Sequence, residues 1–176
     1  MKVRLLLLSV AFVIAGCATS SQPVEVKYEK ASEQTTYLTD EMRLGGVEAT
    51  SGLSRDNRYY IQIEASCSGE DCTPAQYTLS FVKEGTQPIK LTGRDVALTV
   101  GTETLQWSDP QNRRVSQTSV IRNGTFARVK VSPEQLVTIG SVSEVSGTVG
   151  NINFDIPHQN RAPIRELLSR LELTKT

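Results

Sequence analysis

Few residues in this chain of 176 have the type and spacing for chemistry, and the first candidates are two of its three cysteines. Cys67 and Cys72 enclose Ser-Gly-Glu-Asp, a turn-forming stretch, and such an even pair closes to a disulfide in an oxidising compartment. A redox pair or half of a metal site is the alternative. The spacing is not C-x-x-C, however, and the chain has one histidine. We therefore expect a structural disulfide, whose short loop contributes about 2 kcal/mol.

The third cysteine, Cys17, follows a segment with the features of an export signal. Two cations precede an apolar run that is shorter than the roughly 20 residues of a spanning helix. The run Ile14-Ala15-Gly16-Cys17 resembles the lipobox of bacterial lipoproteins, and an ordinary secretory signal with an incidental cysteine is the alternative. The resemblance implies a signal peptide over residues 1–16, removed after Gly16. It also implies diacylglycerol and a palmitate-type acyl chain on Cys17.

The residue after the cysteine bears on location. In proteobacterial lipoproteins an aspartate at this position favours retention at the inner membrane, whereas this chain has Ala18. The resemblance therefore implies the outer membrane, facing the periplasm, in a Gram-negative host. Each buried methylene contributes about 0.8 kcal/mol, so two or three acyl chains make a lasting anchor. This covalent lipid is the one non-protein group that the sequence predicts.

His158 is the one candidate for acid–base catalysis. With Asp155 it forms an Asp–His pair of the kind that activates a serine, but the chain has no G-x-S-x-G elbow. Ser80 and Lys83 match S-x-x-K, yet on a strand they face opposite sides, and the companion S-D-N and K-T-G motifs are absent. We assign no catalytic residue, and an envelope hydrolase that uses His158 remains an alternative.

Charge and ligand spacing narrow the possible partners. The acidic clusters Asp40-Glu41 and Glu70-Asp71 lack the alternating spacing of a calcium loop, so we predict no metal site. Removing residues 1–16 lowers the 19 basic residues to 17 against 19 acidic ones, and a net charge of −2 argues against nucleic acid. Five basic residues could gather on one hairpin face and bind an acidic envelope polymer or protein, although a solvated strand face is the simpler interpretation: Arg113, Arg114, Arg122, Arg128 and Lys130.

The elements that must position these residues are predominantly short strands. Residues 17–34 are polar, and we expect a lipidated N-terminus and tether there, with an edge strand at Val24, Val26 and Tyr28 as the alternative. Apolar residues then alternate with polar ones in several closely spaced runs, which predicts a single domain over residues 35–176. The runs are 59–65, 77–81, 89–91, 96–100 and 105–107.

Two hairpins and two helices complete the prediction. Asn123-Gly124 is a two-residue turn signal between Val120 and Ile121 and a strand over 126–131, in which Ala127, Val129 and Val131 share one face. Gly150-Asn151 joins a second pair of strands. Ser132, Pro133 and Gln135 predict a capped helix that Gly140 ends, and a second helix from about Pro163 has one apolar stripe: Ile164, Leu167, Leu168 and Leu171.

The C-terminal order resembles an uncharacterised type of bacterial envelope domain. In that type a β-rich body ends in a Ser/Thr-x-Glu-Gln-Leu turn, a hairpin and an amphipathic helix, and the pattern matches residues 132–171 most closely. The resemblance and the strand spacing together predict a mainly β fold, an antiparallel sandwich or barrel-like domain. We expect a non-enzymatic, membrane-anchored binding or structural module of the envelope. The alternatives are the hydrolase and a carrier of a small apolar ligand.

Overall fold

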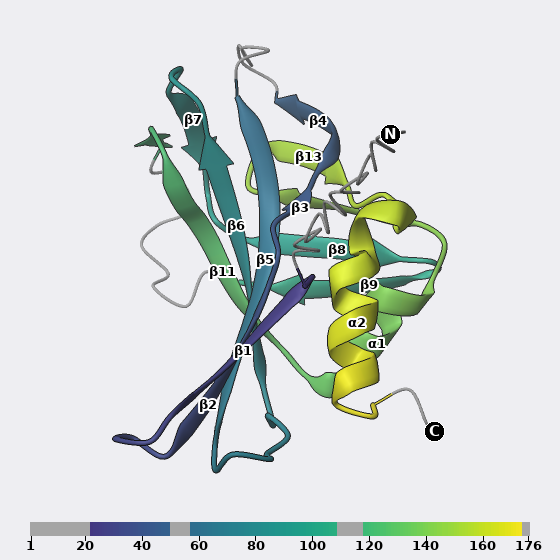
Figure 1. The fold of residues 1–176 in the computed structure, drawn as a ribbon. Helices are drawn as coiled ribbons and strands as arrows, with labels where there is room; N and C mark the ends of the chain where they lie inside the picture. Colours follow the sequence, from purple (N-terminus) through teal and green to yellow (C-terminus); the bar gives the residue numbers. More distant parts are fainter. Residues whose placement is uncertain (1–21, 50–56, 109–117, 174–176) are drawn as a thin grey trace, which may run out of the picture.

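The computed structural model describes residues 22–49, 57–108 and 118–173 and confirms the mainly β fold (Figure 1). Two large antiparallel sheets face each other, and two helices cover one end of the space between them. Each sheet keeps open edges within the described residues, so the arrangement is sandwich-like rather than closed. None of the described helices is both long enough and apolar enough to span a membrane.

The first sheet consists of six antiparallel strands in the order β1-β2-β5-β6-β11, with β3 also paired to β5. Its strands are β1 (Val24–Glu29), β2 (Gln34–Thr39), β3 (Met42–Arg43), β5 (Arg58–Ser68), β6 (Tyr77–Glu84) and β11 (Gly124–Val131). The predicted alternation is confirmed in β5, where Tyr59, Ile61 and Ile63 are buried while Arg58 and Glu64 are exposed. One face of this sheet is therefore core and the other is open to solvent.

The second sheet has the order β4-β13-β12-β8-β9, and β7 and β10 form a separate pair. Its strands, and then those of the pair, are β4 (Gly45–Ala49), β13 (Ile152–Asp155), β12 (Val145–Val149), β8 (Val96–Val100), β9 (Glu103–Trp107), β7 (Ile89–Thr92) and β10 (Thr118–Ile121). Figure 1 shows β8 and β9 running across the direction of β5 and β6. The hairpin of β12 and β13 through Gly150-Asn151 is confirmed.

The core lies between the two sheets and contains aromatic contacts that join them. Phe81 on β6 lies 6.2 Å from Phe126 on β11 and 5.4 Å from Phe154 on β13, measured between ring centroids. The ring planes are tilted, as aromatic pairs prefer, and such a pair contributes about 1 kcal/mol beyond burial of its area. Phe81 therefore contacts both β11 of its own sheet and β13 of the second sheet.

The two helices follow the sequence signals closely. In α1 (Pro133–Ser141), Ser132 accepts from the Gln135 amide and Gln135 accepts from the Ser132 amide, which is the predicted capping box. The prediction that Gly140 ends this helix is wrong, because α1 continues through Ser141. Gly140 instead allows α2 (Ala162–Arg170) to approach, since a methyl group there would lie 2.9 Å from Leu168. The predicted apolar stripe of α2 is buried.

The N-terminal boundary of the folded domain differs from the prediction. Residues 24–29 form β1, which pairs with β2 along its whole length, and the Val24 side chain is fully buried. The tether expected up to Gln34 is therefore wrong for this stretch, and the edge strand that we kept as an alternative is present. The weak alternation of Val24, Val26 and Tyr28 was the relevant signal.

The hairpin predicted at Asn123-Gly124 is also absent. β10 pairs with β7, whereas β11 pairs with β6, so the strands on the two sides of the turn have different partners. Gly124 does have a positive φ of 96°, the conformation that a glycine permits, and the chain uses it to change sheets. The predicted faces of β11 are confirmed: Val129 and Val131 are buried, and Arg128 and Lys130 are exposed.

Candidate binding groove

The predicted disulfide is present at the end of β5. The Sγ atoms of Cys67 and Cys72 are 2.11 Å apart. The loop that they close is held against β2, since the Tyr37 hydroxyl donates to the Cys72 carbonyl at 2.9 Å and the Gly69 amide donates to the Glu33 carbonyl at 2.8 Å. Burial, and secondarily the Asp71 carboxylate, raises the pKa of Tyr37. These contacts fix the disulfide loop against the neighbouring strand, which is consistent with a structural role for the cysteine pair.

Several predicted residues lie outside the described part of the chain. Cys17 and Ala18 are among them, so lipidation and membrane location stay predictions from the sequence. Two of the five basic residues, Arg113 and Arg114, lie outside it as well.

Asp155 and His158 lie at the end of β13 and in the 3-10 turn η1 (His158–Arg161). Both side chains are exposed. The Asp155 carboxylate faces the backbone of β4 so closely that a methyl group on Gly46 would lie 2.6 Å from one of its oxygens. The His158 carbonyl accepts a hydrogen bond from Arg165 at 3.0 Å. The hydrolase hypothesis stays a prediction.

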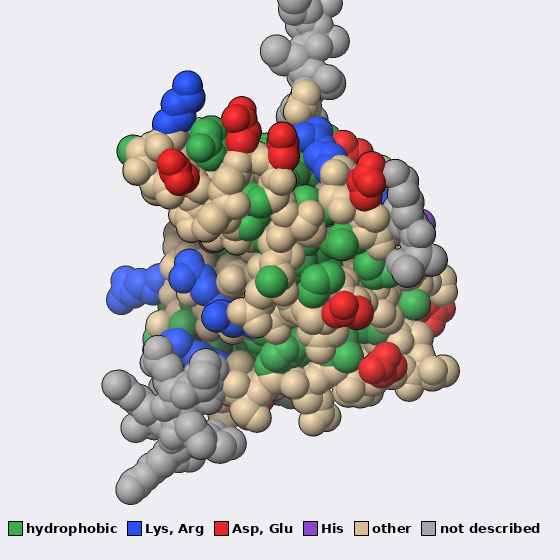
Figure 2. Space-filling model, turned by 90° about the horizontal axis from the view of Figure 1, so that it is seen from below, with side chains coloured by type: hydrophobic (Ala, Val, Ile, Leu, Met, Phe, Trp, Pro, Cys, Tyr) green, Lys and Arg blue, Asp and Glu red, His purple; other side chains and the backbone are tan. Residues whose placement is uncertain are grey.

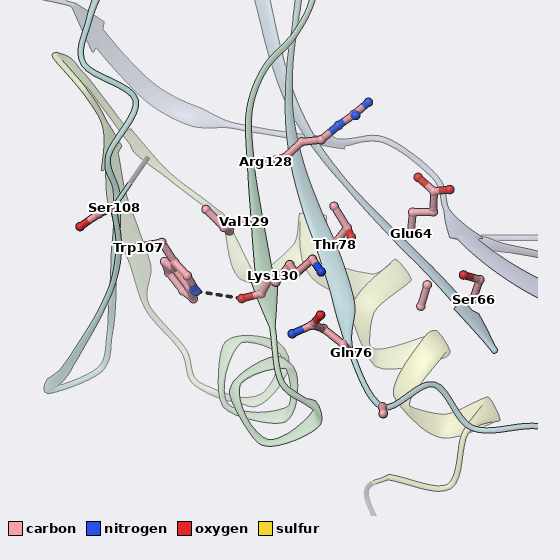
Figure 3. Close-up of a pocket in the computed structure, with 11 residues that line it drawn as sticks. Glu64, Ser66, Gln76, Thr78, Trp107, Ser108, Arg128, Val129 and Lys130 are labelled. Carbon is pink, nitrogen blue, oxygen red and sulfur yellow. Dashed lines mark hydrogen bonds between the residues drawn. The ribbon is translucent and has the colours of Figure 1, made fainter. Parts of the chain in front are cut away.

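An open groove of about 870 Å³ lies along the first sheet, lined by residues of its solvent face together with the buried Ala65 and Val129. Strands β5, β6 and β11 form its floor, and the end of β9 forms one wall. Its charged and large polar side chains are drawn in Figure 3. The lining residues on the strands and the adjoining loops include Glu64, Ser66, Gln76, Thr78, Trp107, Ser108, Arg128 and Lys130.

Trp107 reaches the groove from the second sheet. Its indole Nε1–H donates to the Lys130 carbonyl at 2.8 Å, so the ring lies beside β11 (Figure 3). That bond satisfies the one polar group of the indole, and the half-buried ring leaves apolar surface for a ligand. Trp107 is thus positioned by a backbone contact between the edge strands of the two sheets.

The groove contains two cations and one carboxylate. Arg128 and Lys130 project from β11 on its exposed side, and Glu64 projects from β5. Figure 3 shows the Lys130 side chain directed toward Thr78 and Gln76, and the Arg128 side chain directed away from Trp107. Within the described residues neither cation forms a salt bridge. Their charges are therefore available to a ligand.

Basic side chains also gather on one side of the wider surface. Seen from below, Lys and Arg side chains gather on the left of the molecule, the side on which Figure 1 shows β11 (Figure 2). Acidic side chains lie mostly elsewhere on this face. Of the five basic residues considered as a possible cluster, with a solvated strand face as the simpler interpretation, Arg128 and Lys130 line the groove. Arg122 lies outside β11 and does not line it.

Lys83, which the sequence singled out only through the S-x-x-K match, is a buried charge. Its side chain is fully buried on β6, and the ammonium group donates to the carbonyl oxygens of Gly85, at 3.3 Å, and Arg122. Burial lowers the pKa of this lysine. The alternation of the strand could have indicated this burial, because residues 77, 79, 81 and 83 share the core face, opposite to Ser80. Gly85 follows β6 and Arg122 precedes β11, so Lys83 joins the two connecting segments at this end of the strand pair.

Arg161 is the second buried cation, and its role is also structural. The guanidinium donates to the carbonyls of Ile139 and, at 2.8 Å, Ser143. These carbonyls lie at the C-terminal end of α1, where unpaired acceptors and the helix dipole favour a positive charge. Burial, and then the nearby Arg165, lowers the pKa of Arg161.

One further observation bears on what the site can hold. Within the described residues, no three His, Cys, Asp or Glu side chains come together in a way that could hold a metal ion.

Comparison of the chain with protein-family models, with curated proteins and with solved structures finds no match.

Proposed function

We propose that this protein is a lipid-anchored binding module of the bacterial cell envelope, and that its groove binds an extended acidic segment of an envelope protein. The observation that carries the proposal is that Trp107, Arg128 and Lys130 all line one open groove. The proposed location is the outer membrane, facing the periplasm, with the lipid on Cys17. The proposed action is binding, without a catalytic step and without nucleic acid.

Charge supports an acidic ligand. The mature chain has a net charge of −2, yet the groove holds two cations against one carboxylate. A locally positive groove on an acidic protein steers anionic segments to that place and disfavours other orientations. Arg128 and Lys130 are two residues apart on the same face of β11, about 7 Å along the strand. This spacing matches carboxylates at alternate positions of an extended peptide.

The shape of the groove supports an extended ligand. Its floor is made of residues from three adjacent strands, and it is open to solvent. Trp107 adds a rigid aromatic wall, the type of residue that dominates binding energy at protein interfaces. The hydroxyl and amide groups of Ser66, Gln76 and Thr78 provide hydrogen bonds to a peptide backbone.

The test uses Trp107 itself, because it is the only tryptophan of the chain. Titrating the protein with poly-glutamate should change the tryptophan fluorescence, and added salt should weaken the effect. The double variant Arg128→Gln, Lys130→Gln should bind about fivefold to thirtyfold more weakly, since each exposed charge contact contributes about 0.5 to 1 kcal/mol. Lys90→Gln on β7, an exposed cation outside the groove, is the matched control.

Two outcomes would contradict the proposal. One is fluorescence that does not respond to poly-glutamate at low salt. The other is an equal loss of binding in the Lys90 variant, which would indicate attraction by overall charge and not by the groove. A response to an acidic polysaccharide but not to poly-glutamate would replace the peptide with a polymer ligand.

A further inference from the structure

The outer edge of β1 is a second surface with a specific chemistry, distant in sequence from the groove. β1 is the last strand of its sheet, and no described strand pairs with its other side. Helix α2 contacts the beginning of the strand, where Arg170 donates to Gln22 at 3.3 Å. Further along, Val26 is 44% exposed, and it is one of two exposed large hydrophobic residues in the described part of the chain.

The hydrogen bonds show which backbone groups this edge offers. The Asp40 amide donates to the Pro23 carbonyl at 2.9 Å, so these two residues are a hydrogen-bonded pair of the β1–β2 ladder. Pairs of this kind alternate along an antiparallel ladder, and the register is continuous from Val24 to Glu29. The N–H and C=O groups of Val24, Val26 and Tyr28 therefore point away from β2, toward the open edge.

We propose that this edge is a self-association surface, on which two copies pair their β1 strands antiparallel about a two-fold axis at Val26. In this register Val26 lies opposite Val26 of the second copy, and Val24 lies opposite Tyr28. Each pair joins backbone groups that point outward, so about six backbone hydrogen bonds form. The two exposed valines meet across the axis and bury each other.

Charge selects this register over its neighbours. Centring on Val26 places Glu25 opposite Lys27 twice, at positions without backbone bonds, where facing side chains are closest. A shift to a centre at Lys27 would place lysine opposite lysine and Glu25 opposite Glu29. A shift to a centre at Glu25 would place glutamate opposite glutamate and leave a shorter overlap within the strand. A centre at Tyr28 would also place Lys27 opposite Glu29 twice, but there only residues 27–29 of the strand overlap, against residues 24–28 when Val26 is the centre. The strand is thus self-complementary over most of its length in one register.

The interface is two-fold symmetric, so it closes at a dimer. The same patch is used by both copies, and no free β1 edge remains after pairing. Pairing would also cover an edge that is otherwise open to unspecific strand addition, a known hazard for exposed strands. This inference is independent of what the groove binds.

The test is a cysteine at the two-fold axis, introduced in the full chain and examined in cell membranes. In the proposed register the two residue-26 Cα atoms are about 5.5 Å apart, within disulfide range. With diamide as oxidant, which takes up the two electrons and two protons, Val26→Cys should give a dimer band on non-reducing gels. Val120→Cys on β10, the other exposed hydrophobic, is the matched control, and the unsubstituted chain gives the background.

Charge variants on the Val26→Cys background test the register. Lys27→Glu places two pairs of glutamates face to face and should lower the dimerisation constant about tenfold. Adding Glu25→Lys restores both opposite-charge pairs and should recover the dimer. Equal crosslinking of the Val26 and Val120 variants would overturn the proposal, as would a Lys27→Glu variant that dimerises normally. A ladder of higher oligomers would contradict the closed two-fold arrangement.

Discussion

The guanidinium of Arg161 donates to the carbonyl of Ile139, so the residue that precedes α2 completes the hydrogen bonding at the end of α1. A second donor from the same side chain reaches the Ser143 carbonyl. The side chain is fully buried, and the contact therefore joins the two helices where Gly140 also lets them approach.

Replacing Arg161 with Met should destabilise the protein by about 2 kcal/mol, because the buried Ile139 carbonyl and the partly exposed Ser143 carbonyl both lose their donor. Chemical denaturation measures the change. The stability of Arg161→Lys should lie between those of the unsubstituted protein and Arg161→Met, since a single ammonium group cannot donate to both carbonyls as the guanidinium does. Arg170→Met, which removes an exposed contact with Glu166, should cost less than about 1 kcal/mol. Equal losses for the two Met variants would show that the buried contact has no special role.

Gly147→Ala should destabilise the second sheet. The added methyl group would lie 2.5 Å from the Ala97 carbonyl oxygen and 2.6 Å from Leu98, and a backbone atom in a paired strand cannot move aside cheaply. We expect a loss of about 2 kcal/mol in the free energy of unfolding. The neighbouring exposed Ser146→Ala is the control for strand position. A Gly147 variant that unfolds at the same denaturant concentration as the unsubstituted protein would contradict the packing described for this sheet.

Tyr77 should make stability depend on alkaline pH. Burial, and secondarily Tyr37, raises the pKa of Tyr77 from 10.0 to about 12. Between these values the unfolded chain releases the proton and the folded chain keeps it, so stability falls as pH rises, by about 3 kcal/mol in all. Tyr77→Phe should flatten this part of the profile. Within the described residues the Tyr77 hydroxyl has no hydrogen-bond partner, so the variant should lose little stability at pH 7.

His158→Ala separates binding from hydrolysis. We expect an unchanged envelope phenotype, because the His158 side chain is exposed and the proposed groove does not include it. The comparison strain carries Arg128→Gln and Lys130→Gln, which should reproduce the effect of deleting the protein. A His158 variant that behaves like the deletion would favour the hydrolase.

Labelling with radioactive palmitate tests the anchor directly. Incorporation should disappear in Cys17→Ala, and the protein should no longer sediment with membranes, since the acyl chains supply most of the binding energy. The Cys67 and Cys72 pair serves as the internal control, because its disulfide should persist in the unanchored variant. Persistent label in Cys17→Ala would show that the lipobox resemblance is misleading.

Local patterns predicted the buried faces and the helix caps because these depend on neighbours in sequence. Alternation alone identified the core residues of β5, and Ser132 with Gln135 identified the start of α1. Strand partners depend on distant residues instead. The turn signal at Asn123-Gly124 was therefore overruled when β10 paired with β7.

The sequence predicted no groove, for the same reason. Arg128 and Lys130 could be placed on one face from their spacing, but their neighbour Trp107 comes from a different sheet. The alternating run 105–107 placed Trp107 on a strand but said nothing of its partner, so only the folded chain shows that it lies beside β11. Lys83 illustrates the converse case: its parity with Phe81 pointed to the core, although its charge suggested the surface.

The early start of β1 sets how far the folded domain can stand from the bilayer. Val24 is the seventh residue after Cys17, and seven residues span at most about 25 Å even when fully extended. With Cys17 acylated, the first strand therefore stays within that distance of the lipid headgroups. With so short a linker, the folded domain could not move far from the membrane. Its partners would have to come to the membrane surface, where diffusion is lateral and two such domains meet in a thin layer.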